Sequence, residues 1–141
     1  MTISGAEAIE RLVLDTSAYS QLRSGHTQVI DLVARAGIVL MPVVVLGELE
    51  AAFEVGSRAT ENRVALTDFL AEPFVSVLTT THEVARRYGE IFGRLRRAGT
   101  PIPVNDIWIA ATTLDCGGHL LTFDRDFQRV ETLRCTVISP D

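Results

Sequence analysis

Residues 11–19 have the sequence RLVLDTSAY, a short apolar run that ends on Asp15 and passes into a polar turn. Residues 11–14 are expected to form a strand buried on both faces of a sheet, because the apolar residues are consecutive rather than alternating with polar ones. Asp15 then lies at the carboxyl end of this strand. Thr16 or Ser17 is expected to cap a short helix through residues 19–22, and a role as helix N-cap is the structural alternative for Asp15 itself and for Asp106.

Short apolar runs and longer helical patterns continue to alternate along the 141 residues, with no linker or repeat between them. Further strands are expected at 38–41, 74–78, 119–122 and 134–138, and longer helices at 27–36, 42–55, 60–71, 80–97 and 105–114. Thr80 and Asn105 are the expected N-caps of the last two helices. This alternation predicts one α/β domain with a mainly parallel sheet of about five strands, covered on both faces.

Four acidic residues are placed where such a sheet would bring them together. Asp15 follows the first strand, and Asp124 lies two residues beyond the expected strand at 119–122. Glu48 and Asp106 belong to the early turns of two helices, which start near the same edge in this architecture. Ligands of parallel sheets bind outside the carboxyl ends of the strands, so we expect the four carboxylates to share one cleft.

Four carboxylates in one cleft repel one another, and each raises the pKa of its neighbours. A bound Mg²⁺ or Mn²⁺ ion would remove this repulsion, because both ions prefer oxygen ligands. Such ions hold phosphate groups and activate water for hydrolysis. The acids therefore predict a metal-dependent enzyme whose substrate is a phosphodiester.

The amino-acid composition argues against several classes of function and location. All thirteen basic residues are arginine, which excludes chemistry that requires a lysine, and the net charge of −5 argues against nucleic-acid binding by bulk charge. Cys116 and Cys135 lack CxxC spacing and are expected to be reduced residues of a cytoplasmic protein. The longest apolar run, 38–46, is too short to span a membrane, and residues 1–10 do not resemble a secretory signal.

The motifs LDTSAY, GELE, NDIWIAA and TFDRDF, in this order, resemble those of PIN-domain ribonucleases, in particular the VapC-type toxins of bacterial toxin–antitoxin pairs. The resemblance runs from Arg11 to the C-terminus and leaves residues 1–10 as an N-terminal extension. It implies a three-layer α/β/α sandwich and Mg²⁺- or Mn²⁺-dependent cleavage of RNA. It also implies a homodimer and a small cognate antitoxin that blocks the cleft, and the apolar sides of the helices at 42–55 and 60–71 would offer the dimer surface.

The resemblance assigns a role to each acid. Asp15 and Asp106 match the acids that act as primary metal ligands, and Asp124 matches one that orders a second metal ion or its waters. Glu48 matches a glutamate that acts through metal-bound water or as a general base. The implied catalytic residues are thus Asp15, Glu48, Asp106 and Asp124, and the implied metal ligands are Asp15, Asp106 and Asp124.

Several neighbours of these acids stay open. Asp126 is a candidate additional ligand, although on a turn or at a helix start it is expected to point away from Asp124. Thr16 or Ser17 either orients Asp15, binds a phosphate oxygen or caps a helix, and Asn105 has the same alternatives beside Asp106. Trp108 is expected to pack against the protein rather than to stack on a base.

Five arginines fall in one predicted helix, between Arg86 and Arg97. Helical spacing favours ion pairs from Glu83 to Arg87 and from Glu90 to Arg94 on a solvated face. The alternative is an electrostatic rail for an RNA backbone.

Three other functions are alternatives to a toxin ribonuclease. A HAD-like phosphatase would need a second aspartate two residues after Asp15, where this chain has Ser17. A non-catalytic PIN-like module that binds RNA or protein typically lacks one or more of the acids, all of which are present here. An RNA-processing nuclease without an antitoxin has the same residues. A short DNA-binding protein encoded immediately upstream would favour the toxin, and its absence would favour RNA processing or a scaffold role.

Overall fold

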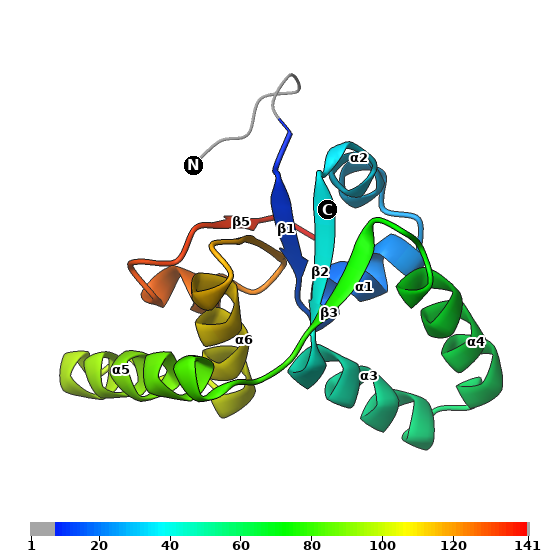
Figure 1. The fold of residues 1–141 in the computed structure, drawn as a ribbon. Helices are drawn as coiled ribbons and strands as arrows, with labels where there is room; N and C mark the ends of the chain where they lie inside the picture. Colours follow the sequence, from blue (N-terminus) through cyan, green and yellow to red (C-terminus); the bar gives the residue numbers. More distant parts are fainter. Residues whose placement is uncertain (1–7, 141) are drawn as a thin grey trace.

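The computed structural model describes residues 8–140. Most of the expected N-terminal extension, residues 1–7, lies outside the described residues. The centre of the fold is a five-stranded sheet with the strand order β3-β2-β1-β4-β5 (Figure 1). Every pair of neighbouring strands is parallel, which confirms the predicted sheet. The strands are β1 (Arg11–Leu14), β2 (Ile38–Pro42), β3 (Val75–Leu78), β4 (His119–Thr122) and β5 (Cys135–Val137).

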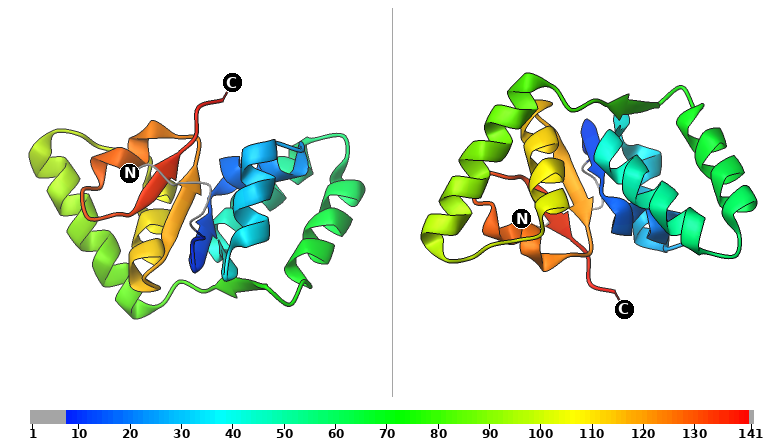
Figure 2. Two further views of the ribbon diagram at one scale, coloured as in Figure 1. Left: turned by 90° about the horizontal axis from the view of Figure 1, so that it is seen from above. Right: turned by 90° about the horizontal axis from the view of Figure 1, so that it is seen from below.

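Helices cover both faces of the sheet, as expected for a three-layer α/β/α sandwich. They are α1 (Thr16–Arg23), α2 (Thr27–Arg35), α3 (Val43–Val55), α4 (Ala59–Leu70), α5 (His82–Ala98), α6 (Val104–Asp115) and the 3₁₀ helix η1 (Arg125–Arg129). The first four helices lie on one side of the sheet, and α5, α6 and η1 lie on the other (Figure 2). Across the described residues, none of these helices is both long and apolar enough to cross a bilayer.

The central strand β1 and its neighbour β4 lie in the core and set the position of the site. Leu12, Val13 and Leu14 of β1 are fully buried, as are Leu120 and Leu121 of β4. The chain leaves β1 toward one face of the sheet, whereas it enters β4 from the other face. This reversal opens a crevice at the carboxyl ends of the two strands, which is where parallel sheets bind ligands.

Three helix starts differ from the sequence-based prediction. Asp15 itself caps α1, in place of Thr16 or Ser17, because its carboxylate accepts the amide hydrogen of Ala18. Thr81 rather than Thr80 caps α5, through a hydrogen bond from Val84 N.

The third difference is at α6, where Pro103 occupies the N-cap position and the expected cap, Asn105, lies inside the helix. Asn105 is therefore free to contact another element. Trp108, also on α6, stacks on Tyr88 of α5 with 4.1 Å between ring centroids, which confirms its packing role.

Candidate metal centre

Asp15 is the most deeply buried acid of the cleft, with 5% of its surface exposed. Its Oδ1 accepts hydrogen bonds from Ala18 N at 2.8 Å and from Ser17 Oγ at 2.7 Å, and its Oδ2 accepts one from Thr122 Oγ1. Burial raises the pKa of Asp15, the three hydrogen bonds lower it, and the charge of Asp124 raises it again, with a net rise. The carboxylate is held in place by donors from both α1 and β4.

The two hydroxyl groups that bind Asp15 also bind the turn after β4. Thr122 Oγ1 accepts the amide hydrogen of Asp124 at 3.0 Å, and Ser17 Oγ accepts that of Phe123 at 3.0 Å. Each hydroxyl thus donates to Asp15 and accepts from the turn that carries Asp124. The first and fourth predicted acids are coupled through these two side chains.

Glu48 projects from α3 and is held from two other elements. Thr16 Oγ1 of α1 donates to its Oε1 at 2.6 Å, and Asn105 Nδ2 of α6 donates to its Oε2 at 3.4 Å. Thr16 and Asn105, two residues with open roles in the sequence, therefore both orient Glu48. Ser17 orients Asp15.

Asp106, Asp124 and Asp126 form the tightest acidic cluster among the described residues. One carboxylate oxygen of each lies within 4.8 Å of the others, a spacing that fits a single cation. The expectation that Asp126 points away from Asp124 is wrong. Asp124 caps η1 by accepting Asp126 N at 2.9 Å, so the chain turns back and the two carboxyl groups face the same space.

Asp106 is the acid whose pKa is raised by four neighbouring acids of the cleft. Partial burial and the negative charges around it raise its pKa to about 7. In order of decreasing effect, these charges belong to Asp124, Glu48, Asp15 and Asp126. Four acids therefore act on Asp106 across a single cleft, where a cation would relieve the repulsion.

The donor set in this cleft suits a hard divalent ion. The three oxygens of the cluster are carboxylate oxygens, the ligands that Mg²⁺ and Mn²⁺ prefer. Both oxygens of Asp15 already accept hydrogen bonds from the protein. The residues present fit a resident ion, and the three that lie closest together include Asp126.

A family model described as the PIN domain matches residues 12–133. The chain belongs to the PIN-domain family. The matched region contains the three acids of the cluster as well as Asp15 and Glu48.

Relatives with curated descriptions match part of this PIN domain. It is 32% identical over 80 residues to "Ribonuclease VapC1" from Haemophilus influenzae (strain R2866), and the match covers 56% of this chain and 59% of that protein. The chain from strain ATCC 51907 is 31% identical over the same length. This chain therefore spans about three fifths of the length of the curated relatives it matches.

Solved structures share the fold over nearly the whole PIN domain. VapBC2 from Rickettsia felis, bound to a DNA fragment from its promoter, aligns with a TM-score of 0.80 at 20% identity, covering 90% of this chain and 98% of that one. VapBC-1 from nontypeable Haemophilus influenzae gives a TM-score of 0.79 at 23% identity, covering 90% and 97%. VapC20 of Mycobacterium tuberculosis, described as a toxin that cleaves the sarcin–ricin loop, gives 0.65 at 23% identity, covering 85% and 95%. At these identities the likeness establishes the fold.

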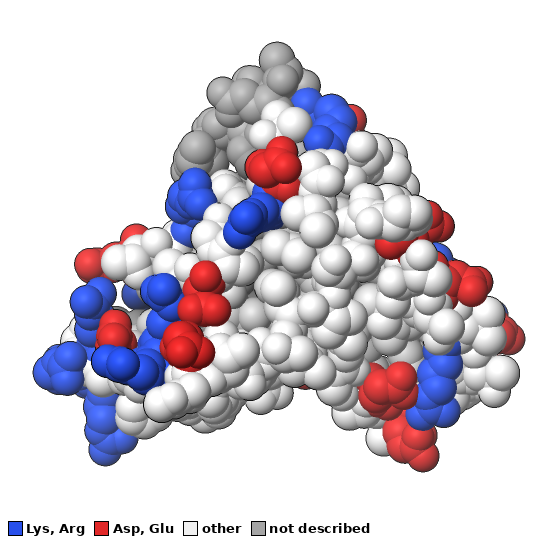
Figure 3. Space-filling model, viewed as in Figure 1, with Lys and Arg blue, Asp and Glu red and all other residues white. Residues whose placement is uncertain are grey.

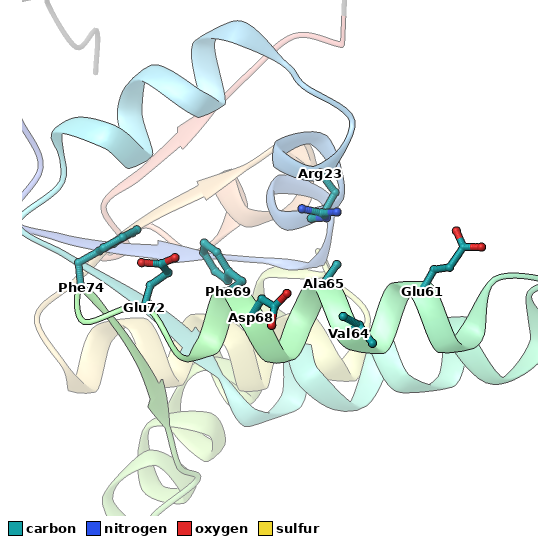
Figure 4. A pocket seen from close by; sticks show the side chains of 8 residues that line it. All are labelled: Arg23, Glu61, Val64, Ala65, Asp68, Phe69, Glu72 and Phe74. Atoms are coloured by element: carbon teal, nitrogen blue, oxygen red, sulfur yellow. The ribbon is translucent and has the colours of Figure 1, made fainter.

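A separate hollow of about 500 Å³ lies between α1 and α4 of the PIN domain (Figure 4). Its acids, Glu61, Asp68 and Glu72, come from α4 and the turn after it, and Arg23 comes from α1. None of the predicted site residues lines it. It is a surface distinct from the acidic cleft.

The raised pKa of Asp106 predicts how pH affects the metal-free PIN domain. The folded state binds the Asp106 proton more tightly than the unfolded chain does. Stability from this group is therefore fully present below the ordinary pKa of 3.8 and is lost as the pH rises from there through about 7. The carboxyl group is only partly buried and solvent screens it, so we expect a loss of about 1–2 kcal/mol. Thermal unfolding in chelator between about pH 5 and about pH 8 measures it.

The control for this measurement is Asp106→Asn, which removes the titrating group. The fall in unfolding temperature over this pH range should be smaller in the variant. A fall of equal size in both proteins would show that another group causes it.

Proposed function

We propose that this PIN domain is a metal-dependent endoribonuclease that hydrolyses RNA phosphodiester bonds. The observation that carries the proposal is the convergence of five carboxylates from α1, α3, α6 and η1 at the crevice between β1 and β4. A bound Mg²⁺ or Mn²⁺ ion would supply charge neutralisation for the phosphate and activation of water. Asp106, Asp124 and Asp126 would hold this ion, and Asp15 is retained as a fourth proposed ligand.

The other residues of the cleft have supporting roles in this proposal. Glu48, whose two oxygens are oriented by Thr16 and Asn105, orients the attacking water and takes up its proton. Ser17 and Thr122 hold Asp15 and the turn that carries Asp124 in fixed positions relative to each other. These assignments retain Asp15, Glu48, Asp106 and Asp124 as catalytic residues and add Asp126 to the predicted ligands.

The biological role that we propose is that of the toxin in a toxin–antitoxin pair. The support comes from the names of the relatives, which are VapC ribonucleases, and from solved homologues that are VapBC complexes. The partners would be an RNA substrate and a small cognate antitoxin, and the chain would act in the cytoplasm. A homodimer fits the exposed apolar residues Val55, at the end of α3, and Val64, in the middle of α4, of which 88% and 56% are exposed.

Removal and return of the metal ion tests the enzymatic part of the proposal. Purified protein should leave RNA intact in chelator, and Mg²⁺ or Mn²⁺ in excess should restore cleavage, whereas added NaCl of equal ionic strength should not. The cleaved fragments are measured by gel electrophoresis and by mapping of their 5′ ends. Cleavage that persists in chelator would contradict a metal-dependent mechanism.

The competing function is a non-catalytic module that binds RNA or protein through the PIN fold. The acids favour the enzyme, because a binding module gains nothing from a carboxyl group whose pKa is raised to about 7 by burial and by like charges. Binding of RNA without cleavage at any metal concentration would favour the module.

A further inference from the structure

A second cavity of about 770 Å³ lies between α5, the start of the loop after it, the end of α6 and the segment that follows Asp126. This volume is within the range of about 300–1,000 Å³ that is typical of ligand sites. Residues from both sides line it: Arg87, Glu90, Ile91, Arg94, Leu95, Arg97, Ala98, Thr100, Leu114, Gln128, Arg129, Val130, Glu131 and Thr132. None of the acids of the metal centre is among them.

Basic residues predominate at the walls of this cavity. Four arginines line it against two glutamates, in a chain whose net charge is −5. Basic side chains also gather over the α5 end of the molecule in the space-filling view (Figure 3). Asp115 and Asp126 pair with Arg87 and Arg129, so the two other arginines of the cavity, Arg94 and Arg97, are the groups that would attract an anion.

The arginines of the cavity differ in whether they form an ion pair. Arg87 forms an ion pair with Asp115 of α6 at 3.1 Å instead of the expected pair with Glu83. Arg94 and Arg97 are exposed, and neither forms an ion pair or side-chain hydrogen bond with any other described residue. These two guanidinium groups keep their donors available for a ligand.

The floor of the cavity is apolar. Ile91 and Leu95 of α5 and Val130 after η1 are 6%, 4% and 6% exposed, respectively. A nucleotide also combines a charged part, the phosphate, with a flat base that can cover apolar protein surface. An inorganic anion would use only the arginines, whereas a nucleotide would use the floor as well.

Arg129 connects this cavity to the metal centre. Its guanidinium group lines the cavity, lies 3.6 Å from Oδ1 of Asp126 and donates to the carbonyl oxygen of Pro101 at 3.0 Å. A chain of phosphates that leaves the acidic cleft past Asp126 would therefore meet Arg129 first, and then Arg94 and Arg97.

We propose that this cavity binds the backbone of single-stranded RNA next to the bond that is cleaved. The proposal rests on the proposed ribonuclease function and extends it, because it assigns a path to the substrate strand. Arg94 and Arg97 contact phosphate oxygens, for which the guanidinium group is well suited, and the apolar floor receives a base or ribose. The charges of Arg94 and Arg97 reduce the repulsion that an RNA strand meets at an acidic chain.

The test measures RNA binding by fluorescence anisotropy in the Asp106→Asn chain, which is expected not to cleave. The probe is a labelled single-stranded oligonucleotide of about 12 nucleotides, within the usual site sizes of single-strand binders. One variant adds Arg94→Ala and Arg97→Ala. The matched control adds Arg86→Ala and Arg96→Ala, which remove the same charge from exposed positions of α5 outside the cavity.

We expect the cavity variant to bind RNA about tenfold more weakly and to lose about 1.4 units from the slope of log K against log salt, the value for two phosphate contacts. The control should stay within about twofold of its parent, since it changes net charge alone. Thermal melting of both variants verifies that they are folded.

Equal weakening in the two variants would overturn the proposal, because bulk charge would then explain it. Unchanged RNA binding in both variants would also overturn it. If the cavity variant binds RNA like its parent but differs from it in oligomeric mass, the cavity would be assigned to a protein partner. Cleavage by the unsubstituted chain is measured in parallel. If that chain cuts RNA while both variants bind like their parent, only the cavity proposal fails, whereas a chain that neither binds nor cuts RNA contradicts the proposed function as well.

Discussion

Replacement of Asp106 by asparagine is expected to lower kcat/KM for RNA cleavage by about 10³-fold, because loss of a charged ligand removes several kcal/mol of transition-state stabilisation. The other four acids of the cleft raise the pKa of Asp106, and its carboxylate is one of the three whose spacing fits a cation. Asparagine preserves the shape of the side chain but not its charge. The variant is therefore expected to be more stable than the parent in metal-free buffer while it is inactive with metal.

Asp115→Asn provides the matched control for this substitution. Asp115 ends the same helix and is exposed, and it pairs with Arg87 rather than with the cluster. Its replacement should change kcat/KM by less than about threefold, since exposed ion pairs contribute at most about 1 kcal/mol. Full activity in Asp106→Asn, or an equal loss in the two variants, would contradict the assignment of the metal centre.

Thr122→Val is expected to destabilise the protein by about 2–3 kcal/mol, because it leaves a buried carboxylate without one of its donors. Thr122 is fully buried, and its hydroxyl group both donates to Asp15 and accepts from the Asp124 amide. Valine has nearly the same volume, so the loss would come from hydrogen bonding rather than from packing. Urea unfolding at fixed pH measures the change.

The control for this variant is Thr113→Val, at the other fully buried threonine. The hydroxyl of Thr113 donates to the carbonyl of Ile109 at 2.8 Å, an oxygen that already lies within the backbone ladder of α6. Its loss should cost less than about 1 kcal/mol. Thr122→Val should also reduce cleavage, whereas Thr113→Val should not. Equal effects of the two variants on stability would contradict the proposed link between Asp15 and the Asp124 turn.

The position of the four predicted acids follows from the sequence because it depends on simple regularities. Consecutive apolar residues marked β1 and β4, and parallel strands end at one edge of a sheet, so Asp15 and Asp124 had to lie close together. Helices that follow parallel strands start at that edge, which places Glu48 and Asp106 there as well. No residue outside these short segments was needed for the prediction.

The role of Asp126 depended on a detail that the sequence does not encode in its periodicity. A regular helix starting at Asp124 would separate the two carboxyl groups, but Asp124 is a non-helical cap and η1 a short 3₁₀ turn. The available signal was the T-x-D-x-D spacing of Thr122, Asp124 and Asp126. The side chains of Thr122 and Asp124 each accept the amide hydrogen of the residue two positions later.

Helix caps and surface ion pairs were less predictable because several residues compete for each role. Asp15 is bonded to β4 through its amide, Asp15 N to Leu121 O at 3.3 Å, and its carboxylate also accepts the amide hydrogen of Ala18. The helix α1 therefore begins at Thr16, one residue earlier than a cap at Thr16 would allow. Arg87 lies within reach of both Glu83 and Asp115, and packing of α5 on α6 favours Asp115. Such choices are settled by tertiary contacts rather than by local spacing.

The most direct measurement is the inducible expression of the parent chain and of Asp106→Asn in a bacterial host, followed by sequencing of RNA 5′ ends. If the acidic cleft cleaves RNA, the parent alone should produce new, site-specific 5′ ends together with growth arrest. The same 5′ ends from folded Asp106→Asn, or none from folded parent protein, would contradict a ribonuclease centred on Asp106.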